Sequence, residues 1–312
     1  MTSADSIFNM FRNRVRATFA VIVLLLSSAV AYGQVQVEKD SSYLDEGHSE
    51  TMDVYTPPQT FLKPFSAVLL IHGGGWISGD KADNRGKSIS TDLASVGFKV
   101  FAVNYKLAIK DSDSTIRSGA WPENFYDCKS ALRFIRKNAA LFGIDPNHIA
   151  VMGESAGGHL ALLVGATAHA ERLNHGGLYT EQSNAVACVV DMYGIPDLSD
   201  RALNYVRSPF RGTNDQQTDE NLRIASPIAY IDKSTPPILI LHGTADKTVP
   251  IEESQKLVKI LKEKGTTYQY IEISDAPHSF NLHPPQMDLR PAVITFLKKC
   301  IGEPKTSPSA AP

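Results

Sequence analysis

The chain has little surplus charge of either sign. Its 312 residues include 31 Lys and Arg against 33 Asp and Glu, which gives a formal net charge of −2. Proteins that bind a phosphate backbone or an anionic lipid surface draw on an excess of basic residues. The sequence therefore gives no electrostatic support to a nucleic-acid partner or to a membrane-surface role.

Cysteine is scarce, and glycine and proline follow no repeat. The 3 cysteines are Cys128, Cys188 and Cys300, so at most one disulfide can form, and whether any two of them pair is left open. No CxxC pair marks a metal knuckle or a redox site, and we expect no metal and no cofactor. A hydrophobic fraction of 43% with 21% charged residues excludes a disordered chain.

Long apolar runs are also missing, apart from one short run near the N-terminus. Phe19–Leu26 is apolar, small residues follow at Ala31–Gly33, and a basic stretch precedes it with Arg12, Arg14 and Arg16. This order predicts a signal peptide over residues 1–33, cleaved before Gln34, and a secreted or periplasmic protein with no stable membrane association afterwards. The alternative is an uncleaved anchor, but an apolar core of about 8–10 residues falls short of the ~20 that cross a bilayer.

After residue 34, short β-branched runs alternate with segments of helix length. The runs that predict buried strands are Ala67–Ile71, Val100–Val103, Ile149–Met152, Ala187–Val190, Ile238–Leu241 and Tyr268–Ile273. The segments that predict helices are Ser88–Val96, Asn124–Phe142, Gly158–Ala168, Glu252–Lys264 and Asp288–Cys300. This alternation predicts one α/β domain over residues 34–301, with a mostly parallel central sheet flanked by helices.

Three segments depart from that alternation. Val35–Tyr55 predicts an antiparallel edge that enters the sheet. Residues 197–231 are polar and follow a strand end, so we expect a short lid-like excursion over the carboxyl ends of the strands. Residues 302–312 are rich in Pro, Ser and Ala and predict a disordered tail.

The pentapeptide Gly153-Glu154-Ser155-Ala156-Gly157 has the pattern G-x-S-x-G. It follows a predicted strand and opens a predicted helix, which is the setting of a nucleophile elbow. The tight turn strains the central residue, and the flanking glycines prevent collisions with strand and helix. We therefore predict that Ser155 is exposed at the end of the sheet as a nucleophile; the alternative is an ordinary glycine-rich helix start.

His72-Gly73-Gly74-Gly75-Trp76 follows another predicted strand. Backbone without side chains can curl so that its N–H groups point into a cavity and hold the negative oxygen of a reacting carbonyl. Neither a Walker lysine nor the G-x-G-x-x-G spacing is present, which weighs against phosphate binding. We expect His72 to brace this loop.

A nucleophilic serine needs a base, and the base needs an orienting acid. His278 follows the last predicted strand and is favoured over His283, which precedes a Pro-Pro pair. Asp246 lies five residues past the strand Ile238–Leu241, at the sheet edge where open α/β sheets place their chemistry. Asp275 and Asp191 are its rivals.

The chain resembles α/β-hydrolase serine esterases of the hormone-sensitive-lipase-like group, especially the exported bifunctional feruloyl/acetyl-xylan esterases among the carbohydrate esterases. The resemblance runs from about Asp53 to Cys300. The residues that carry it are HGGGW with Ser78–Lys81 after it, Val103–Leu107, Phe142–Pro146, GESAGGHLA at Gly153–Ala161, HGTADKTVP at His242–Pro250, and His278–Phe280.

The resemblance implies a catalytic role for each matching residue. Ser155 matches the nucleophile, His278 the general base and acid, and Asp246 the orienting carboxylate. The matching oxyanion donors are the backbone N–H groups of Gly73, Gly74 and Ala156. Trp76 is a candidate substrate contact, and the alternative is that it only packs. Two features depart from the lipase-like pattern: Glu154 stands where Asp is frequent, and there is no long cap before HGGGW, so the site should be open.

The expected function is hydrolysis of short-chain acyl esters, with acetyl or feruloyl groups on plant polysaccharide such as xylan as the expected substrates. One alternative is an amide hydrolase similar to prolyl peptidases or arylformamidases. Against a prolyl peptidase, Ala156 occupies the position where those enzymes usually have Tyr. A catalytically silent binding module on the same scaffold is the alternative from another class.

Overall fold

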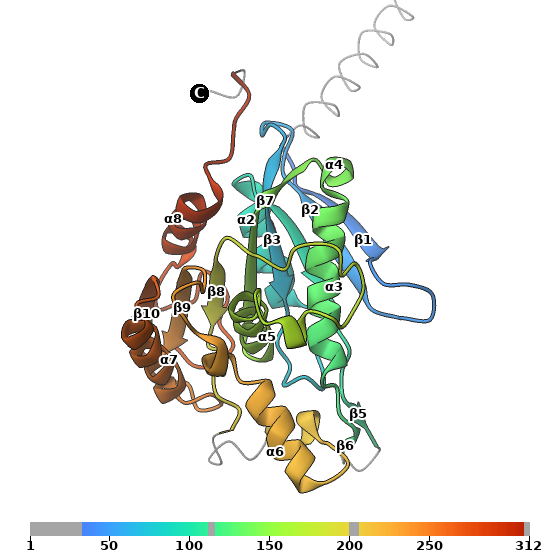
Figure 1. Cartoon of the computed structure of the whole chain (residues 1–312). Helices are drawn as coiled ribbons and strands as arrows, with labels where there is room; N and C mark the ends of the chain where they lie inside the picture. The colour runs from blue at the N-terminus through green and yellow to red at the C-terminus, as the bar shows by residue number, and fades with distance from the viewer. Residues whose placement is uncertain (1–32, 112–115, 200–205, 309–312) are drawn as a thin grey trace, which may run out of the picture.

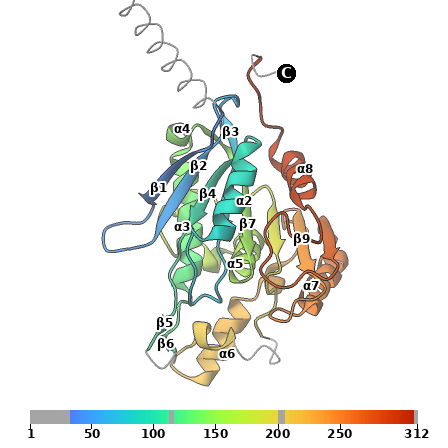
Figure 2. The same ribbon diagram turned by 180° about the vertical axis from the view of Figure 1, so that it is seen from behind.

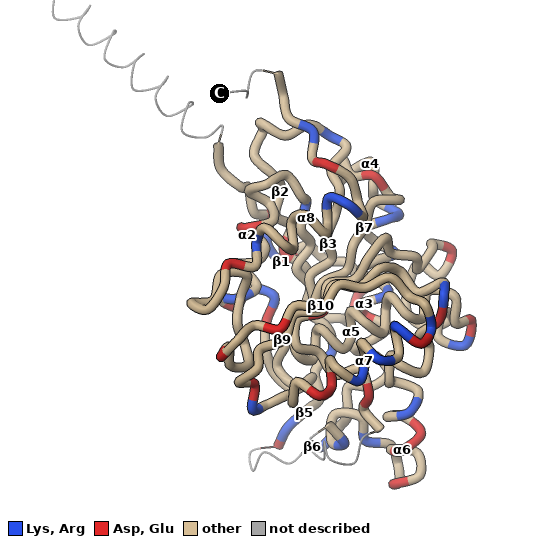
Figure 3. Tube along the Cα trace, turned by 90° about the vertical axis from the view of Figure 1, so that its left-hand side faces the viewer, with Lys and Arg blue, Asp and Glu red and all other residues tan. Residues whose placement is uncertain are grey.

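The computed structural model describes residues 33–111, 116–199 and 206–308 (Figure 1). The predicted signal peptide at residues 1–33 lies almost wholly outside the described residues. Where the structure is described, none of its helices combines the length and the apolar character needed to cross a bilayer. Acidic and basic residues are interspersed along the Cα trace rather than gathered by sign (Figure 3).

An eight-stranded sheet forms the centre of the fold, with the order β1-β2-β4-β3-β7-β8-β9-β10. Strands β1 and β2 run antiparallel to their neighbours, and every other pair is parallel, which confirms the predicted mostly parallel sheet with an antiparallel edge. The strands are β1 (Gln36–Ser42), β2 (Thr51–Thr56), β3 (Phe65–Ile71), β4 (Lys99–Val103), β7 (Ile144–Glu154), β8 (Val189–Met192), β9 (Ile238–Gly243) and β10 (Tyr268–Ile273).

Helices cover both faces of this sheet (Figures 1 and 2). They are α2 (Asn84–Ser95), α3 (Glu123–Lys137), α4 (Ala139–Phe142), α5 (Ala156–Ala166), α7 (Ile251–Lys264) and α8 (Arg290–Ile301). Helix α2 begins earlier than predicted because Asp83 caps it, accepting a hydrogen bond of 2.6 Å from the Gly86 N–H. The single helix predicted at Asn124–Phe142 is two helices, because the backbone leaves the helical region at Asn138.

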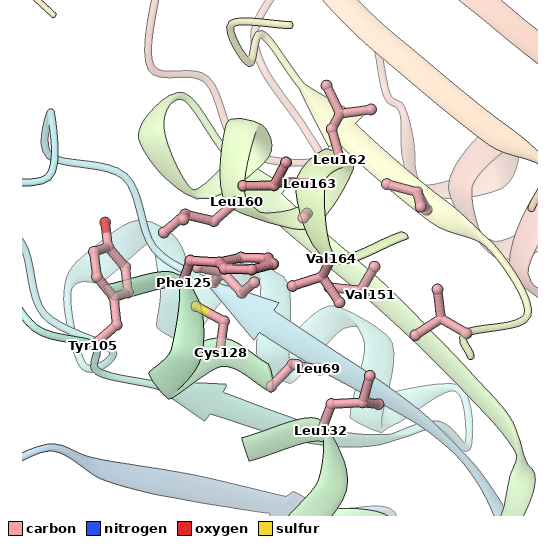
Figure 4. Packing of buried hydrophobic residues seen from close by; sticks show 14 of the residues in the cluster. Leu69, Tyr105, Phe125, Cys128, Leu132, Val151, Leu160, Leu162, Leu163 and Val164 are labelled. Atoms are coloured by element: carbon pink, nitrogen blue, oxygen red, sulfur yellow. The ribbon is translucent and has the colours of Figure 1, made fainter. Parts of the chain in front are cut away.

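Alternate residues of each central strand belong to two separate hydrophobic clusters. In β3, Val68 and Leu70 pack in the cluster that contains residues of α2 and α8. Leu69 packs in the cluster that contains residues of α3, α5 and α7, part of which Figure 4 shows. Each fully buried aliphatic side chain contributes about 1.5–3 kcal/mol, so these two clusters fix the sheet rigidly between its helices.

Strand β8 starts and ends later than the apolar run Ala187–Val190 that predicted it. The polar residue Asp191 breaks the apolar pattern in the sequence, yet it is fully buried within the strand. Its Oδ1 accepts a hydrogen bond of 2.9 Å from the Gly194 N–H, which offsets part of the cost of burial.

The segment after β8 forms the predicted excursion, described here for residues 197–199 and 206–231. It contains helix α6 (Asp215–Ile224) and the 3₁₀ helices η3 (Ser208–Phe210) and η4 (Pro227–Tyr230). Strands β5 (Ile109–Lys110) and β6 (Ile116–Ser118) form a small hairpin. The chain that follows this hairpin is hydrogen-bonded to the excursion, since the Ala120 N–H donates to the Pro209 carbonyl at 2.9 Å. Figure 1 shows α6 beside this hairpin.

Part of the C-terminal tail, for which disorder was predicted over residues 302–312, pairs with the segment before β3. The Leu62 N–H donates to the Lys305 carbonyl at 2.7 Å, and the Ser307 N–H donates to the Thr60 carbonyl at 2.8 Å. Backbone pairing needs no particular side chains, which explains why composition did not indicate it. Residues 309–312 lie outside the described part of the chain.

Candidate active site

The predicted nucleophile lies in a sharp turn between β7 and α5. Ser155 has φ 53° and ψ −119°, a strained conformation for a residue with a side chain. The turn is so tight that a Cβ on Gly157 would lie 2.1 Å from the Ile71 carbonyl oxygen, and one on Gly153 would lie 2.1 Å from the Gly157 carbonyl oxygen. We call residues 153–157 the nucleophile elbow; its two outer glycines are required by space.

The structure brings Ser155, His278 and Asp246 into one hydrogen-bonded line. His278 Nε2 lies 3.0 Å from Ser155 Oγ, and His278 Nδ1 lies 2.6 Å from Asp246 Oδ2. The histidine side chain is 14% exposed and the aspartate side chain is buried. A serine, an imidazole and a carboxylate in this order can move a proton from the hydroxyl to the ring while the acid stabilises the imidazolium.

Several donors converge on the Asp246 carboxylate. Its Oδ1 accepts from the backbone N–H groups of Thr248 and Val249 at 2.8 and 2.9 Å. Its Oδ2 lies 3.4 Å from Nε2 of His242, a second and fully buried histidine. Burial alone would raise the pKa of Asp246, but the hydrogen bonds from His242, His278 and Val249 hold it far below its usual range. Asp246 is therefore ionised throughout the neutral range.

The residues considered as rivals in the sequence lie elsewhere. His283 Nε2 lies 3.1 Å from Ser88 Oγ and 3.6 Å from Asp92 Oδ2. Asp275 lies in a turn with φ 58°, its N–H donating to Thr244 Oγ1. Asp191 is fully buried under the elbow, and burial raises its pKa to about 7.

The HGGGW segment lies directly against the elbow. A Cβ on Gly73 would lie 3.0 Å from the Glu154 carbonyl oxygen and 3.3 Å from the Ser155 Cβ. Gly73, Gly74 and Ala156 line one cavity with Ser155, as an oxyanion role requires. The oxyanion roles of these three residues stay a prediction.

His72 braces this segment, in keeping with the expectation from the sequence. Its Nδ1 lies 2.6 Å from the Gly73 carbonyl oxygen, and its ring stacks on Tyr105 with the centroids 4.4 Å apart. The Tyr105 hydroxyl donates to the His72 carbonyl at 2.9 Å. Burial lowers the pKa of His72, so the ring is neutral at pH 7.

Trp76 is mainly a packing residue in this structure. It lines the cavity but is only 1% exposed, and its ring meets Phe210 edge to face at 5.0 Å. Its Nε1 donates to His159 Nδ1 at 3.2 Å, and the other nitrogen of His159 lies 2.8 Å from the Ala225 carbonyl oxygen. Little of the indole face is left for a substrate, and its contact role stays a prediction.

A network of hydrogen bonds and one ion pair connects the nucleophile elbow to the chain around His278, and no sequence motif predicted it. The buried Glu154 carboxylate pairs with Arg85 and lies 2.9 Å from the Tyr193 hydroxyl. Arg85 Nε donates to the Ser279 carbonyl at 3.1 Å, and the Tyr193 hydroxyl lies 2.7 Å from the Phe280 carbonyl. The only signal in the sequence was Glu154 itself, at a position where related esterases often have Asp.

The cavity at Ser155 has a volume of about 390 Å³. Besides the predicted residues, its walls include Asp83, Arg85, Ile195, Thr248, Val249 and Ser279. Over the described ranges, no group of three or more His, Cys, Asp or Glu side chains is placed to hold a metal ion. The cavity is therefore a small, mixed polar and apolar site centred on a serine.

Comparison with known proteins identifies a matching family and similar chains. A family model, BD-FAE, matches residues 52–261. Esterase LipC of Mycobacterium tuberculosis is 29% identical over 75% of this chain and 58% of its own, so the chain spans less than two thirds of that relative.

Solved structures show the same architecture. A truncated carbohydrate esterase from gut microbiota superposes with a TM-score of 0.74 at 24% identity, covering 86% of this chain and 97% of that one. A bifunctional GH43-CE protein of Bacteroides eggerthii gives 0.73 at 26% identity, covering 85% and 35%. The chain therefore belongs to the BD-FAE family and has the α/β-hydrolase fold.

Proposed function

We propose that the chain is an exported serine hydrolase of carboxylic esters. The observation that carries the proposal is the line Ser155–His278–Asp246, with 3.0 and 2.6 Å between the successive partners. The BD-FAE family match and the similarity to esterase LipC support an ester as the substrate.

The reaction would proceed through an acyl-enzyme. Ser155 Oγ attacks the ester carbonyl carbon while its proton passes to His278 Nε2, and Asp246 stabilises the imidazolium. The tetrahedral oxyanion accepts hydrogen bonds from the backbone N–H groups of Gly73, Gly74 and Ala156. Collapse breaks the bond to the alcohol oxygen, which takes the proton from Nε2 as it leaves.

Water then completes the cycle. It gives a proton to His278 Nε2 and attacks the acyl carbon, and the second collapse returns the proton to Ser155 Oγ with release of the acid. Each oxyanion donor would lower the barrier by about 3–4 kcal/mol. The network of Arg85, Glu154 and Tyr193 keeps elbow and histidine aligned through both steps.

The finer part of the proposal is that the acyl group is acetyl or feruloyl and that its alcohol belongs to a plant polysaccharide such as xylan. The match to BD-FAE and the similarity to a GH43-CE protein favour a carbohydrate ester. A panel of acetyl, butyryl and feruloyl esters and acetylated xylan, compared by kcat/KM, tests this part. A preference for butyryl esters over all carbohydrate esters would reject it.

The serine assignment has a direct test. We expect a fluorophosphonate probe to label the wild-type protein at Ser155, and Ser155→Ala to lose both the label and the hydrolysis of p-nitrophenyl acetate. Full turnover by Ser155→Ala would overturn the mechanism. Export is tested separately by sequencing the N-terminus of the protein recovered outside the cytoplasm, where Gln34 is expected to come first.

A further inference from the structure

A second histidine contacts the carboxylate of Asp246. His242 lies near the end of β9, and its side chain is fully buried. Its Nε2 lies 3.4 Å from Asp246 Oδ2, the same oxygen that lies 2.6 Å from His278 Nδ1. One carboxylate oxygen thus meets two imidazole rings. The reaction proposed above uses His278, which also contacts Ser155, and leaves His242 without a role.

The contacts of His242 fix where its ring proton lies. Nε2 lies 2.9 Å from the Val249 carbonyl oxygen, which can only accept, so Nε2 carries the proton. Nδ1 must then accept, and the Ser254 hydroxyl donates to it at 2.7 Å. Ser254 belongs to α7 and is itself fully buried. The ring is therefore held at both nitrogens, with its N–H directed at the segment that carries Asp246.

This N–H supports the Asp246 carboxylate in two ways. Its positive end lies beside Oδ2, and it also binds the carbonyl of Val249, whose own N–H donates to Asp246 Oδ1 at 2.9 Å. Burial would raise the pKa of Asp246, but the hydrogen bonds from His242 and His278 hold it far below its usual range. His242 is therefore one of the groups that set the charge on Oδ2.

The charge on Oδ2 determines how strongly this oxygen stabilises a protonated His278. A donor beside an oxygen draws charge from it, so the His242 N–H weakens the attraction between Oδ2 and the imidazolium. The unprotonated ring is the form that can accept the Ser155 proton. The contact with His242 therefore favours the active form of His278 as the pH falls.

Other charged and titratable groups surround these three residues. On the cavity side and along β8 they are Asp83, Arg85, Asp191 and Tyr193, and on the side of α7 and β10 they are Glu253, Lys256 and Glu272. Glu253 and Lys256 pair with each other at 3.0 Å. Burial raises the pKa of Asp191 to about 7, so this residue titrates near neutrality beside His242.

We propose that His242 is a positioning residue that acts through Asp246 and extends the pH range of the reaction toward acid. Ser254 takes part by donating to Nδ1 of the ring, which makes the Nε2–H a stronger donor. This proposal rests on the proposed function, because it needs His278 to act as the base.

The test is the pH dependence of kcat/KM for ethyl acetate, whose alcohol does not titrate near neutrality. His242→Leu removes the donor, so the acid limb of the profile should move to higher pH by about half a unit. In the plateau kcat should fall by less than about tenfold, because the N–H groups of Thr248 and Val249 still hold Oδ1. Ser254→Ala should move the limb in the same direction by a smaller amount.

His159→Leu is the matched control. His159 is also fully buried with a partner at each ring nitrogen, but these partners are Trp76 and the Ala225 carbonyl rather than Asp246. This variant should leave the acid limb in place, whatever its effect on stability. The shift caused by His242→Leu should also persist in an Asp191→Asn background, which removes the neighbouring acid.

A further measurement needs no variant. Long-range proton–nitrogen NMR spectra of the wild type should show the proton of His242 on Nε2. A proton on Nδ1, or an acid limb that stays in place or moves to lower pH in His242→Leu, would overturn the proposal. An equal shift in His159→Leu, or a shift that disappears with Asp191→Asn, would do the same.

Two further outcomes are decided by other measurements. If His242→Leu does not fold, an unmoved acid limb in Ser254→Ala overturns the proposal and a limb at higher pH supports it. If the proposal fails, the proposed ester hydrolysis still stands provided that Ser155 is labelled and ethyl acetate is cleaved; without either, both proposals fail.

Discussion

The nucleophile elbow and the chain around His278 meet at one hydrogen bond, but different forces hold them in place. In the elbow, backbone atoms pack against backbone atoms, and the glycines leave no room for a Cβ. Residues 274–286, which we call the histidine loop, are tied instead by side chains: Arg85 to the Ser279 carbonyl and Tyr193 to the Phe280 carbonyl. Ser155 is thus fixed by steric exclusion, and His278 by replaceable hydrogen bonds.

This difference implies that substitutions of the elbow glycines act on folding, whereas those that affect His278 act on the rate. The largest expected effect belongs to the histidine side. Asp246→Asn should lower kcat by about 10⁴-fold, because an amide neither stabilises the imidazolium nor fixes the ring's tautomer. Steady-state kinetics with p-nitrophenyl acetate measure this, and circular dichroism should show an unchanged fold. A loss below tenfold would remove Asp246 from the triad.

Substitution of an elbow glycine should lower the stability of the fold. Gly157→Ala places a Cβ 2.1 Å from the Ile71 carbonyl oxygen, so the backbone must shift. We expect a loss of about 3 kcal/mol or more in the free energy of unfolding, measured by urea denaturation. Gly265→Ala is the control, since Gly265 has a positive φ of 70° but no atom near the added Cβ; it should cost about 1–2 kcal/mol. Equal losses in the two variants would contradict the steric account.

The surroundings of the elbow and of His278 also differ in the ionisation of their buried carboxyl groups. Asp246 meets several donors and is ionised, whereas burial raises the pKa of Asp191, under the elbow, to about 7. Between pH 4 and 7 the unfolded chain therefore releases the Asp191 proton while the folded chain retains it, and this residue lowers stability as the pH rises. Asp191→Asn keeps the acceptor for the Gly194 N–H. Relative to the wild type, the free energy of unfolding of this variant should therefore increase by a few kcal/mol between pH 4 and pH 7, as measured by urea denaturation. A difference between the two proteins that does not change with pH would contradict the raised pKa of Asp191.

A milder change tests the side-chain ties of the histidine loop. Tyr193→Phe removes the hydroxyl that lies between Glu154 and the Phe280 carbonyl. The loop should hold His278 less accurately, so kcat should fall about tenfold with KM within twofold, because the ring is misplaced for proton transfer rather than for binding. A rise in KM at constant kcat would mean that Tyr193 shapes the cavity instead.

The smallest effect is expected at the histidine that the structure places away from Ser155. His283→Ala should leave kcat for ethyl acetate within twofold, since its ring lies with Ser88 and Asp92. His278→Ala, measured beside it, should lose nearly all activity. The reverse result would exchange the two assignments.

Local patterns predicted the parts of the site that depend on neighbours in the chain. The strand, turn and helix around Ser155 follow from five adjacent residues, and Asp246 and His278 followed from their positions after strand ends. The parallel sheet was likewise predicted from its short apolar runs. The end of β8 was not, because the polar Asp191 interrupts the apolar run inside that strand.

Contacts between distant residues could not be predicted in this way. Arg85 pairs with Glu154 across 69 positions, and Tyr193 reaches the Phe280 carbonyl across 87. No periodicity links such residues, because their meeting depends on how the sheet and α2 pack. The pairing of Lys305 with Leu62 could not be predicted for a related reason: it uses backbone atoms, which composition does not record.

His159 links two parts of the molecule that have separate tasks. One ring nitrogen accepts from Trp76, beside the predicted oxyanion glycines, so the other carries the proton and donates to the Ala225 carbonyl, where α6 ends. Burial lowers the pKa of this ring to about 4, which keeps it neutral and able to serve both partners. The excursion and the HGGGW segment are therefore joined through one imidazole, so a displacement of α6 would reach the glycines for which an oxyanion role is predicted.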